Sequence, residues 1–179
     1  GGYAKSDIEH YLKDILNVQV PKITDINVSG ATNCPGLNYL HDFEITMDLE
    51  ILGAIARNAN LNVYFSPNTE IGFIHALIAA IFDKTRKNTI ISISWGLAES
   101  RWRKSTIKII NSLFKAAALL GISVCAPSGN KGACAGLTDG RVHVEFPASS
   151  PYVLSCGGTI LKIKNNKNRK EVVWNEEKM

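Results

Sequence analysis

Apolar residues recur along the middle of the chain with two different periods. Three segments place them three or four positions apart, as amphipathic helices do, and these segments span residues 42–56, 69–83 and 105–120. Short apolar runs, predicted to be strands, lie between or after them at residues 61–65, 89–93 and 122–126. The last two runs are apolar at nearly every position, which is typical of parallel strands covered on both faces. This alternation predicts an α/β fold with a doubly wound, mostly parallel sheet and helices on both faces.

The remaining segments give shorter signals. Ser6 is placed to cap a helix over residues 6–16, residues 23–28 alternate like a strand, and the turn-rich residues 29–40 predict a surface loop. Gly121 is placed to end the third long helix in a left-handed conformation. The apolar residues spaced for burial are Ile8, Tyr11, Leu12 and Ile15 in the first helix, and Ile45, Leu49, Leu52 and Ile55 in the next. Three further short strands are predicted at residues 153–156, 159–163 and 171–174.

Composition indicates an ordinary soluble globular protein. The chain has 179 residues, enough for one domain with a substantial core, and is 45% hydrophobic and 20% charged with a net charge of +4. Basic residues are densest at 162–170, where no aromatic residue lies between them, so we expect a solvated hairpin tip. The apolar stretch at 71–82 is too short to cross a membrane and contains His75. We therefore expect neither nucleic acid nor membrane as a partner.

Four cysteines leave the redox compartment open. Cys125 and Cys156 fall in apolar, strand-like runs, where a buried free thiol is expected. Cys34 and Cys134 fall in loops and could pair in an oxidising compartment. The sequence has no Cys-x-x-Cys motif, which argues against a zinc knuckle or a thioredoxin-like site, and we predict no metal site in this chain.

Two loops follow predicted parallel strands and are candidate ligand sites. Ser94-Trp95-Gly96 follows the strand at 89–93, and Ser128-Gly129-Asn130 follows the strand at 122–126 after Pro127. Ligands in open α/β sheets bind beyond the carboxyl ends of the strands, and each loop has a glycine that lets the backbone approach a ligand. Taken singly, each glycine is better explained by a simple chain turn, and Trp95 by packing.

An acidic pair lies on the helix predicted at 42–56. Glu44 and Asp48 are four residues apart, so their carboxylates share one face of the helix. Two carboxylates held close in a cleft share a proton, which separates their pKa values and allows Glu44 to act as a general base oriented by Asp48. An ordinary solvated helix face is the alternative, and Glu50 on the same helix, to which we assign no role, illustrates it.

The chain resembles the sedolisins, the serine-carboxyl peptidases of subtilisin-like fold, from Gly1 to Trp174. The resemblance lies in a collinear series of motifs. Three are the motifs Gly1-Gly2-Tyr3, Glu44-x-x-x-Asp48 (continuing to residue 51) and Cys156-Gly157-Gly158-Thr159. The others are residues 28–33, 53–56, 63–69, 92–96, 116–119, 146–153 and 173–175. So long a collinear match is specific, and it favours the functional interpretation of each residue above.

The resemblance implies a role for each candidate residue. Glu44 is the general base and Asp48 supports it, with Trp95 beside this acidic relay. Backbone around Ser94 and Gly96 binds the substrate as an added strand. Residues Ser128, Gly129 and Asn130 form the loop of the oxyanion donor. A carboxylate base remains ionised where histidine is already protonated, so the family works in acid.

Two departures from the family pattern affect the prediction. Asn130 stands where sedolisins have an aspartic acid, and its amide donates at any pH. The family's Gly-Thr-Ser nucleophile motif and its calcium loop have no counterpart before Met179, and the chain opens on Gly1 without an initiator Met. We therefore expect a segment of a longer catalytic domain that is inactive alone, with no cofactor in this chain and calcium in the missing C-terminal part.

The expected partners are a polypeptide substrate, the remaining half of the catalytic domain and a propeptide, and secretion is implied by the family alone. The competing interpretation is a protease-like protein that binds peptides without turnover, which both Asn130 and the missing serine favour. A nucleotide-binding domain is disfavoured, because Gly157-Gly158 is no phosphate motif and neither GxGxxG nor a Walker motif occurs.

Overall fold

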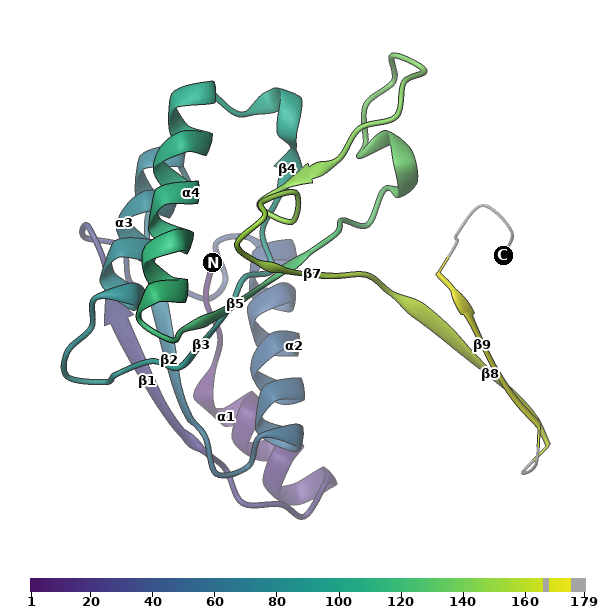
Figure 1. Ribbon diagram of the computed structural model, residues 1–179. Coiled ribbons are helices and arrows are strands. Elements are labelled where there is room, and N and C mark those ends of the chain that lie inside the picture. Colours follow the sequence, from purple (N-terminus) through teal and green to yellow (C-terminus); the bar gives the residue numbers. More distant parts are fainter. Residues whose placement is uncertain (166–167, 175–179) are drawn as a thin grey trace. The chain divides into compact units, whose positions relative to one another are not determined.

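Parallel strand pairs with helices packed against them organise the protein, as the alternating pattern predicts. The computed structural model describes residues 1–165 and 168–174, and the chain divides after Asn88 into two compact units (Figure 1). Among the described residues, no helix has both the length and the apolar character needed to cross a membrane.

The first unit is built on strands β1 (Lys22–Asn27) and β2 (Asn60–Phe65). They pair in parallel, with Lys22 opposite Asn60 and Asn27 opposite Phe65. Parallel strands need a crossover connection, and helix α2 (Tyr39–Ile55) lies within it. Helix α3 (Glu70–Ile81) follows β2, with the hydroxyl of Thr69 accepting from the Gly72 N–H at 3.0 Å as its N-cap.

The two faces of β2 receive different helices. Leu61 and Val63 point to one face, where the core includes residues from helix α1 (Lys5–Glu9), the π-helix η1 (His10–Ile15) and α2. The members of this core are Tyr3, Ile8, Leu12, Leu49, Leu61 and Val63. Asn62 and Tyr64 point to the other face, toward the C-terminal end of α3. Helices therefore cover both faces of β2, as predicted.

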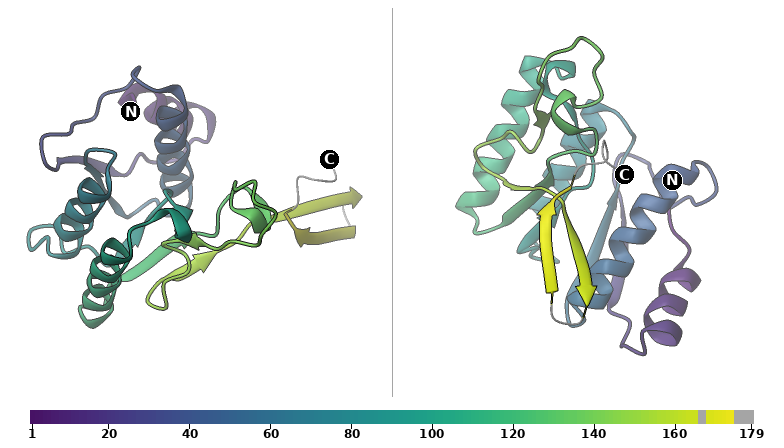
Figure 2. Two further views of the ribbon diagram at one scale, coloured as in Figure 1. Left: turned by 90° about the horizontal axis from the view of Figure 1, so that it is seen from above. Right: turned by 90° about the vertical axis from the view of Figure 1, so that its right-hand side faces the viewer.

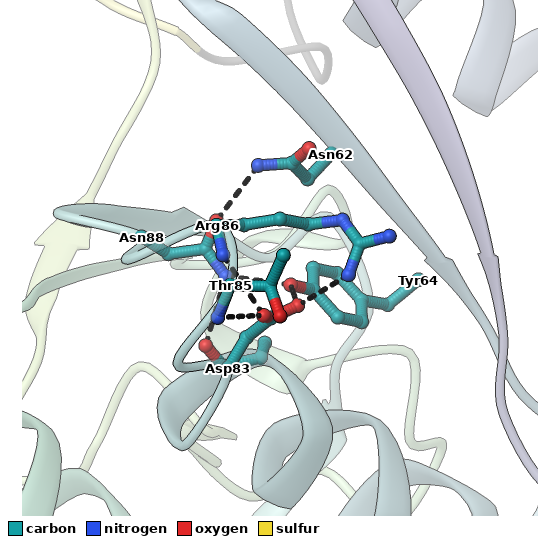
Figure 3. A network of polar contacts seen from close by, with 7 residues as sticks. Asn62, Tyr64, Asp83, Thr85, Arg86 and Asn88 are labelled. Atoms are coloured by element: carbon teal, nitrogen blue, oxygen red, sulfur yellow. Dashed lines mark hydrogen bonds and ion pairs between the residues drawn. The ribbon is translucent and has the colours of Figure 1, made fainter.

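A polar network fixes the segment after α3 (Figure 3). The Asp83 carboxylate accepts from the backbone N–H groups of Thr85 and Arg86, both at 3.0 Å, from Arg86 Nη1 at 2.8 Å and from the Tyr64 hydroxyl at 2.8 Å. The Asn88 side chain donates to the Tyr64 hydroxyl at 2.7 Å and to the Ala80 carbonyl at 2.9 Å. The backbone donor of Arg86 is the main reason that the pKa of Asp83 is lowered to about 2.

Two predictions for the first helix are wrong, and so is the predicted burial of Leu52 and Ile55 in α2. Ser6 lies inside α1, which begins at Lys5 without a side-chain cap. Ile15 is 60% exposed, since the wider π turn, in which Leu16 N–H bonds to the carbonyl five residues back, rotates it away from the core.

In α2, Leu52 is 36% and Ile55 82% exposed. The buried stripe instead continues from Leu49 to Gly53, where a Cβ would lie 2.5 Å from Leu12 Cδ1. This close approach of η1 at a glycine moves the buried face away from Leu52 and Ile55. The helix also begins earlier than predicted, at Tyr39, because the Asn38 side chain caps it by accepting from the N–H of His41 at 3.1 Å.

The second unit contains a three-stranded parallel sheet in the order β3 (Ile90–Ser92), β5 (Ser123–Pro127), β7 (Leu154–Cys156). Helix α4 (Lys104–Leu119) buries Ile110, Phe114 and Ala117 and contacts β5. Gly121 ends this helix with φ +75°, as predicted. The N–H groups of Gly121 and Ile122 bond to the carbonyls of Ala118 and Ala117, which is the Schellman arrangement.

Short antiparallel pairs complete the second unit. Strand β4 (Leu97–Ala98) pairs with β6 (Glu145–Phe146), and both were missed from sequence because two residues carry no periodic signal. Strands β8 (Thr159–Asn165) and β9 (Asn168–Val173) form the predicted hairpin ribbon (Figure 2). The tip at 166–167 and Asn175 of the last family motif lie outside the described residues. Two 3₁₀ turns also occur, at Glu99–Arg101 and Gly132–Cys134.

All four cysteines are free thiols. Cys125 is half-buried, whereas Cys34, Cys134 and Cys156 are exposed. The prediction of a buried Cys156 is wrong, because among the described elements only β5 contacts β7 substantially, and no packed helix covers its exposed side chains.

Candidate active site

Helix α2 presents the acidic pair of the first unit. Glu44 and Asp48 lie one helical turn apart and both are half-buried. Burial raises the pKa of Glu44, and the negative charge of Asp48 raises it further. The two carboxyl groups therefore interact, and Glu44 keeps its proton to a higher pH than an exposed glutamate does.

Two other acids on α2 differ from this pair in what surrounds them. Asp42 accepts from the backbone N–H groups of Gly2, at 2.5 Å, and Gly36, at 2.7 Å, which lowers its pKa and ties down the N-terminal segment. Glu50 has a raised pKa through burial and the charge of Asp7. A raised pKa alone therefore does not distinguish Glu44; its partner on the same helix face does.

The second unit brings the two candidate loops to one edge of its sheet. Ser94-Trp95-Gly96 follows β3 and leads into β4, and Ser128-Gly129-Asn130 follows β5. Because β3 and β5 are parallel neighbours, both loops leave from the same end of the sheet. Trp95 is 46% exposed, and Ser128 and Asn130 are exposed as well. These side chains are open to a ligand at that edge.

Glu145 on β6 is a candidate residue that the sequence analysis missed. A Cβ on Gly129 would lie 2.1 Å from Glu145 Oε1, and a Cβ on Gly96 would lie 3.2 Å from Glu145 Oε2. The carboxyl group therefore lies against the glycine of each loop, and a side chain at position 129 would displace it. Gly129 also has φ +97°, a conformation that a side chain disfavours. One sequence signal was available, because Glu145 is the only acid between Gly140 and Lys170.

Burial alone raises the pKa of Glu145. Across the part of the chain that the structure describes, its carboxyl group makes no hydrogen bond or ion pair. A half-buried carboxyl group without a partner can accept a hydrogen bond or pair with a cation, so a donor-rich ligand at these loops would find one there.

Ser149 lies close to the same short strands. Its N–H bonds to the Glu145 carbonyl at 2.9 Å, and its hydroxyl donates to Glu99 Oε2 at 2.5 Å. The neighbouring hydroxyl of Ser150 donates to Asn111 Oδ1 at 2.5 Å. Both hydroxyls thus fix the segment that follows β6.

The predicted residues thus form two groups, each described within its own unit. Glu44 and Asp48 belong to the first unit, and the residues of the two loops belong to the second. Within residues 1–165 and 168–174, no three His, Cys, Asp or Glu side chains are grouped so that they could hold a metal ion.

Comparison with known proteins gives consistent results along nearly the whole chain. Kumamolisin of Bacillus sp. (strain MN-32) is 43% identical over 177 residues, which cover 98% of this chain. Tripeptidyl-peptidase sed5 of Aspergillus fumigatus is 32% identical over 136 residues, 74% of this chain. Pseudomonas sedolisin, a serine-carboxyl proteinase solved with two molecules of pseudo-iodotyrostatin, matches 98% of this chain with a TM-score of 0.83 and 23% identity. No family model matches the sequence.

The structural match shows that the fold is the α/β, subtilisin-like fold, as the resemblance implied. The chain spans only part of these proteins: 32% of kumamolisin, 23% of the Aspergillus peptidase and 51% of the solved sedolisin chain.

Proposed function

The chain belongs to the sedolisin family, and from this premise we propose that it supplies the general base and the oxyanion donor of a serine-type peptidase. The observation that carries the proposal is the pairing of Glu44 with Asp48 on α2, where burial and the second carboxylate raise the pKa of the first. A base of this kind can accept a proton from a serine hydroxyl and return it to a leaving amine.

Each proton in the proposed reaction has an assigned donor and acceptor. Glu44 takes the proton of a serine hydroxyl supplied by the rest of the catalytic domain while the serine oxygen attacks the peptide carbonyl. The side-chain amide of Asn130 donates to the oxyanion that forms. Glu44 then protonates the leaving amine. Water attacks the acyl carbonyl while Glu44 takes its proton, and Glu44 returns that proton to the serine oxygen as the acyl group leaves. Asp48 remains beside Glu44 throughout these steps and orients it.

We infer that substrates bind as an extended strand along Ser94–Gly96, with Trp95 and Ser128–Gly129 beside it. Glu145 supports a preference for substrates with a basic side chain near the scissile bond. Its carboxyl group lies against Gly96 and Gly129 and has no partner among the described residues. A Lys or Arg of the substrate would supply the missing cation.

The proposed partner for catalysis is the remaining half of the domain, to which we also assign the calcium site. Exposed apolar residues support such a partner, among them Ile55 on α2, which is 82% exposed. We also propose that the complete protein has a propeptide and acts outside the cytoplasm. Both proposals rest on the family relationship alone.

Glu44→Gln in the complete protein tests the proposal directly. The measurement is kcat/KM for a fluorogenic peptide between about pH 3 and pH 8. Glu44→Gln should lose roughly 10²–10⁴-fold in kcat, because the amide cannot accept the proton. Glu50→Gln is the matched control, since Glu50 lies on the same helix and also has a raised pKa. Equal losses in both variants would contradict the assignment of the base.

A non-catalytic, peptide-binding protein is the second candidate function, and Asn130 is the observation that favours it. In that case the complete protein binds peptides and releases no product. Turnover that appears only in the Asn130→Asp variant would establish this alternative.

A further inference from the structure

Strands β5 and β7 bring two cysteines to the same face of their sheet. The strands are parallel, with Cys125 opposite Leu154 and Pro127 opposite Cys156. Paired positions on neighbouring strands point to the same face, and so do residues two apart on one strand. Cys125 and Cys156 therefore share a face in diagonal positions, on strands about 4.8 Å apart.

The thiol of Cys156 is turned back toward the level of Cys125. Its Sγ donates to the carbonyl oxygen of Leu154 at 3.6 Å, and Leu154 is the residue opposite Cys125. Burial raises the pKa of the Cys125 thiol, and the charge of Cys156 and a hydrogen bond between the two thiols add to the effect. The two sulfur atoms are therefore neighbours in the reduced protein.

The two thiols differ in access. Cys156 is exposed on the open side of β7, whereas Cys125 is half-buried in the central strand. A dissolved oxidant therefore meets Cys156 first, and the product finds Cys125 beside it. An accessible thiol next to a resolving thiol is the arrangement found in redox-sensing pairs.

From this arrangement we propose that Cys125 and Cys156 are a redox-active dithiol, which a peroxide converts into an intramolecular disulfide. Peroxide oxidises the Cys156 thiol to a sulfenic acid and releases one water. The Cys125 sulfur then attacks the Cys156 sulfur, and its proton leaves with the hydroxyl group as a second water. Two thiols lose two electrons and two protons in total, and one peroxide is reduced.

Closing the bond requires movement of the strands. Diagonal positions in a parallel sheet have Cα atoms about 8 Å apart, from the strand spacing and the rise of two residues. A disulfide requires about 4.4–6.8 Å, so oxidation must shorten this Cα–Cα distance by about 1.5 Å or more, which requires one strand to slide along the other as well as to approach it. The Ser128 N–H bonds to the Cys156 carbonyl at 2.8 Å, so this shift acts on the loop that carries Asn130. Only this effect on the loop rests on the proposed function; the disulfide itself does not.

The test is made on the reduced 179-residue chain, treated with about one equivalent of hydrogen peroxide and then alkylated. Mass spectrometry of the unreduced digest should find a Cys125–Cys156 cross-link as the main disulfide, in monomeric protein, and reversal by dithiothreitol. The double variant Cys34→Ser, Cys134→Ser should cross-link equally well. A main disulfide that includes Cys34 or Cys134 would overturn the proposal, and so would peroxide consumption that leaves Cys125 and Cys156 alkylated.

Single variants give an independent readout. Cys125→Ser removes the resolving thiol, so a sulfenic acid should accumulate on Cys156 and react with dimedone, and Cys125→Ala serves where the serine variant does not fold. Absence of that adduct in both variants would refute Cys156 as the first site of oxidation. In the oxidised chain the Ser128 amide should exchange with solvent about tenfold faster or more, because its bond to Cys156 is displaced. An unchanged rate would refute the effect on the loop. None of these measurements depends on peptidase activity.

Discussion

Replacing Asp83 by Asn should destabilise the first unit in a pH-dependent way. The carboxylate receives two backbone N–H groups, the Arg86 guanidinium and the Tyr64 hydroxyl (Figure 3). Asn keeps one acceptor oxygen but loses the charge and the second oxygen. The variant therefore cannot satisfy all four donors, and the hydrogen bonds to a charged acceptor become ordinary ones.

The magnitude follows from the pKa of Asp83, which falls from an ordinary value of 3.8 to about 2. That difference corresponds to at most about 2.4 kcal/mol of stability. The Asp83 side chain is 9% exposed but that of Arg86 is 33% exposed, so solvent screening reduces the contribution, and we expect about 1–2 kcal/mol. Because the pKa is lower in the folded state, the contribution is complete above about pH 4 and is lost as the pH falls toward about 2.

Urea unfolding followed by circular dichroism, between about pH 7 and pH 2, measures this contribution. The native chain should be about 1–2 kcal/mol more stable than Asp83→Asn at neutral pH, and the difference should vanish near the acid end. Asp14→Asn is the matched control, because it removes a carboxylate that is 60% exposed, and it should change stability by less than about 0.5 kcal/mol. A difference that persists unchanged at acid pH would refute the electrostatic explanation.

Four further predictions concern the candidate site. In an active complete protein, Asn130→Asp should steepen the loss of kcat/KM toward neutral pH, because a carboxyl donor deprotonates where the amide does not. Glu145→Gln should reduce kcat/KM for peptides with a basic residue near the scissile bond by roughly tenfold and leave apolar peptides little changed; equal losses would contradict the pairing. Gly129→Ala should cost about 1–3 kcal/mol in urea unfolding, more than Gly132→Ala, since its φ of +97° lies farther from the left-handed region that other residues can adopt and its Cβ must also displace the Glu145 carboxyl group. The 179-residue chain should not react with a serine-directed fluorophosphonate; labelling that disappears in Ser149→Ala would instead identify a nucleophile activated by its neighbouring carboxylate.

Local signals in the sequence determined the helices and the longer strands. The apolar spacing along α4 places Ile110, Phe114 and Ala117 on one face, and Gly121 supplies the left-handed residue that ends the helix. Both features depend on residues within one or two turns of each other, so they can be deduced without knowing the partner surfaces. The four-residue spacing of Glu44 and Asp48 is local in the same sense, and burial together with the charge of Asp48 raises the pKa of Glu44.

Contacts between distant segments decided the rest. Glu145 reaches the loops through the pairing of β6 with β4, which joins residues 47 positions apart at Ala98 and Glu145, and no local pattern encodes such a register. The exposure of Ile15 and Ile55 depends on a π turn and on the approach of Leu12 to Gly53. Sequence by itself determined which segments form helices and strands, because those preferences act over a few residues. Tertiary structure decided which faces are buried and which side chains meet, because packing and register depend on segments that the chain brings together only on folding.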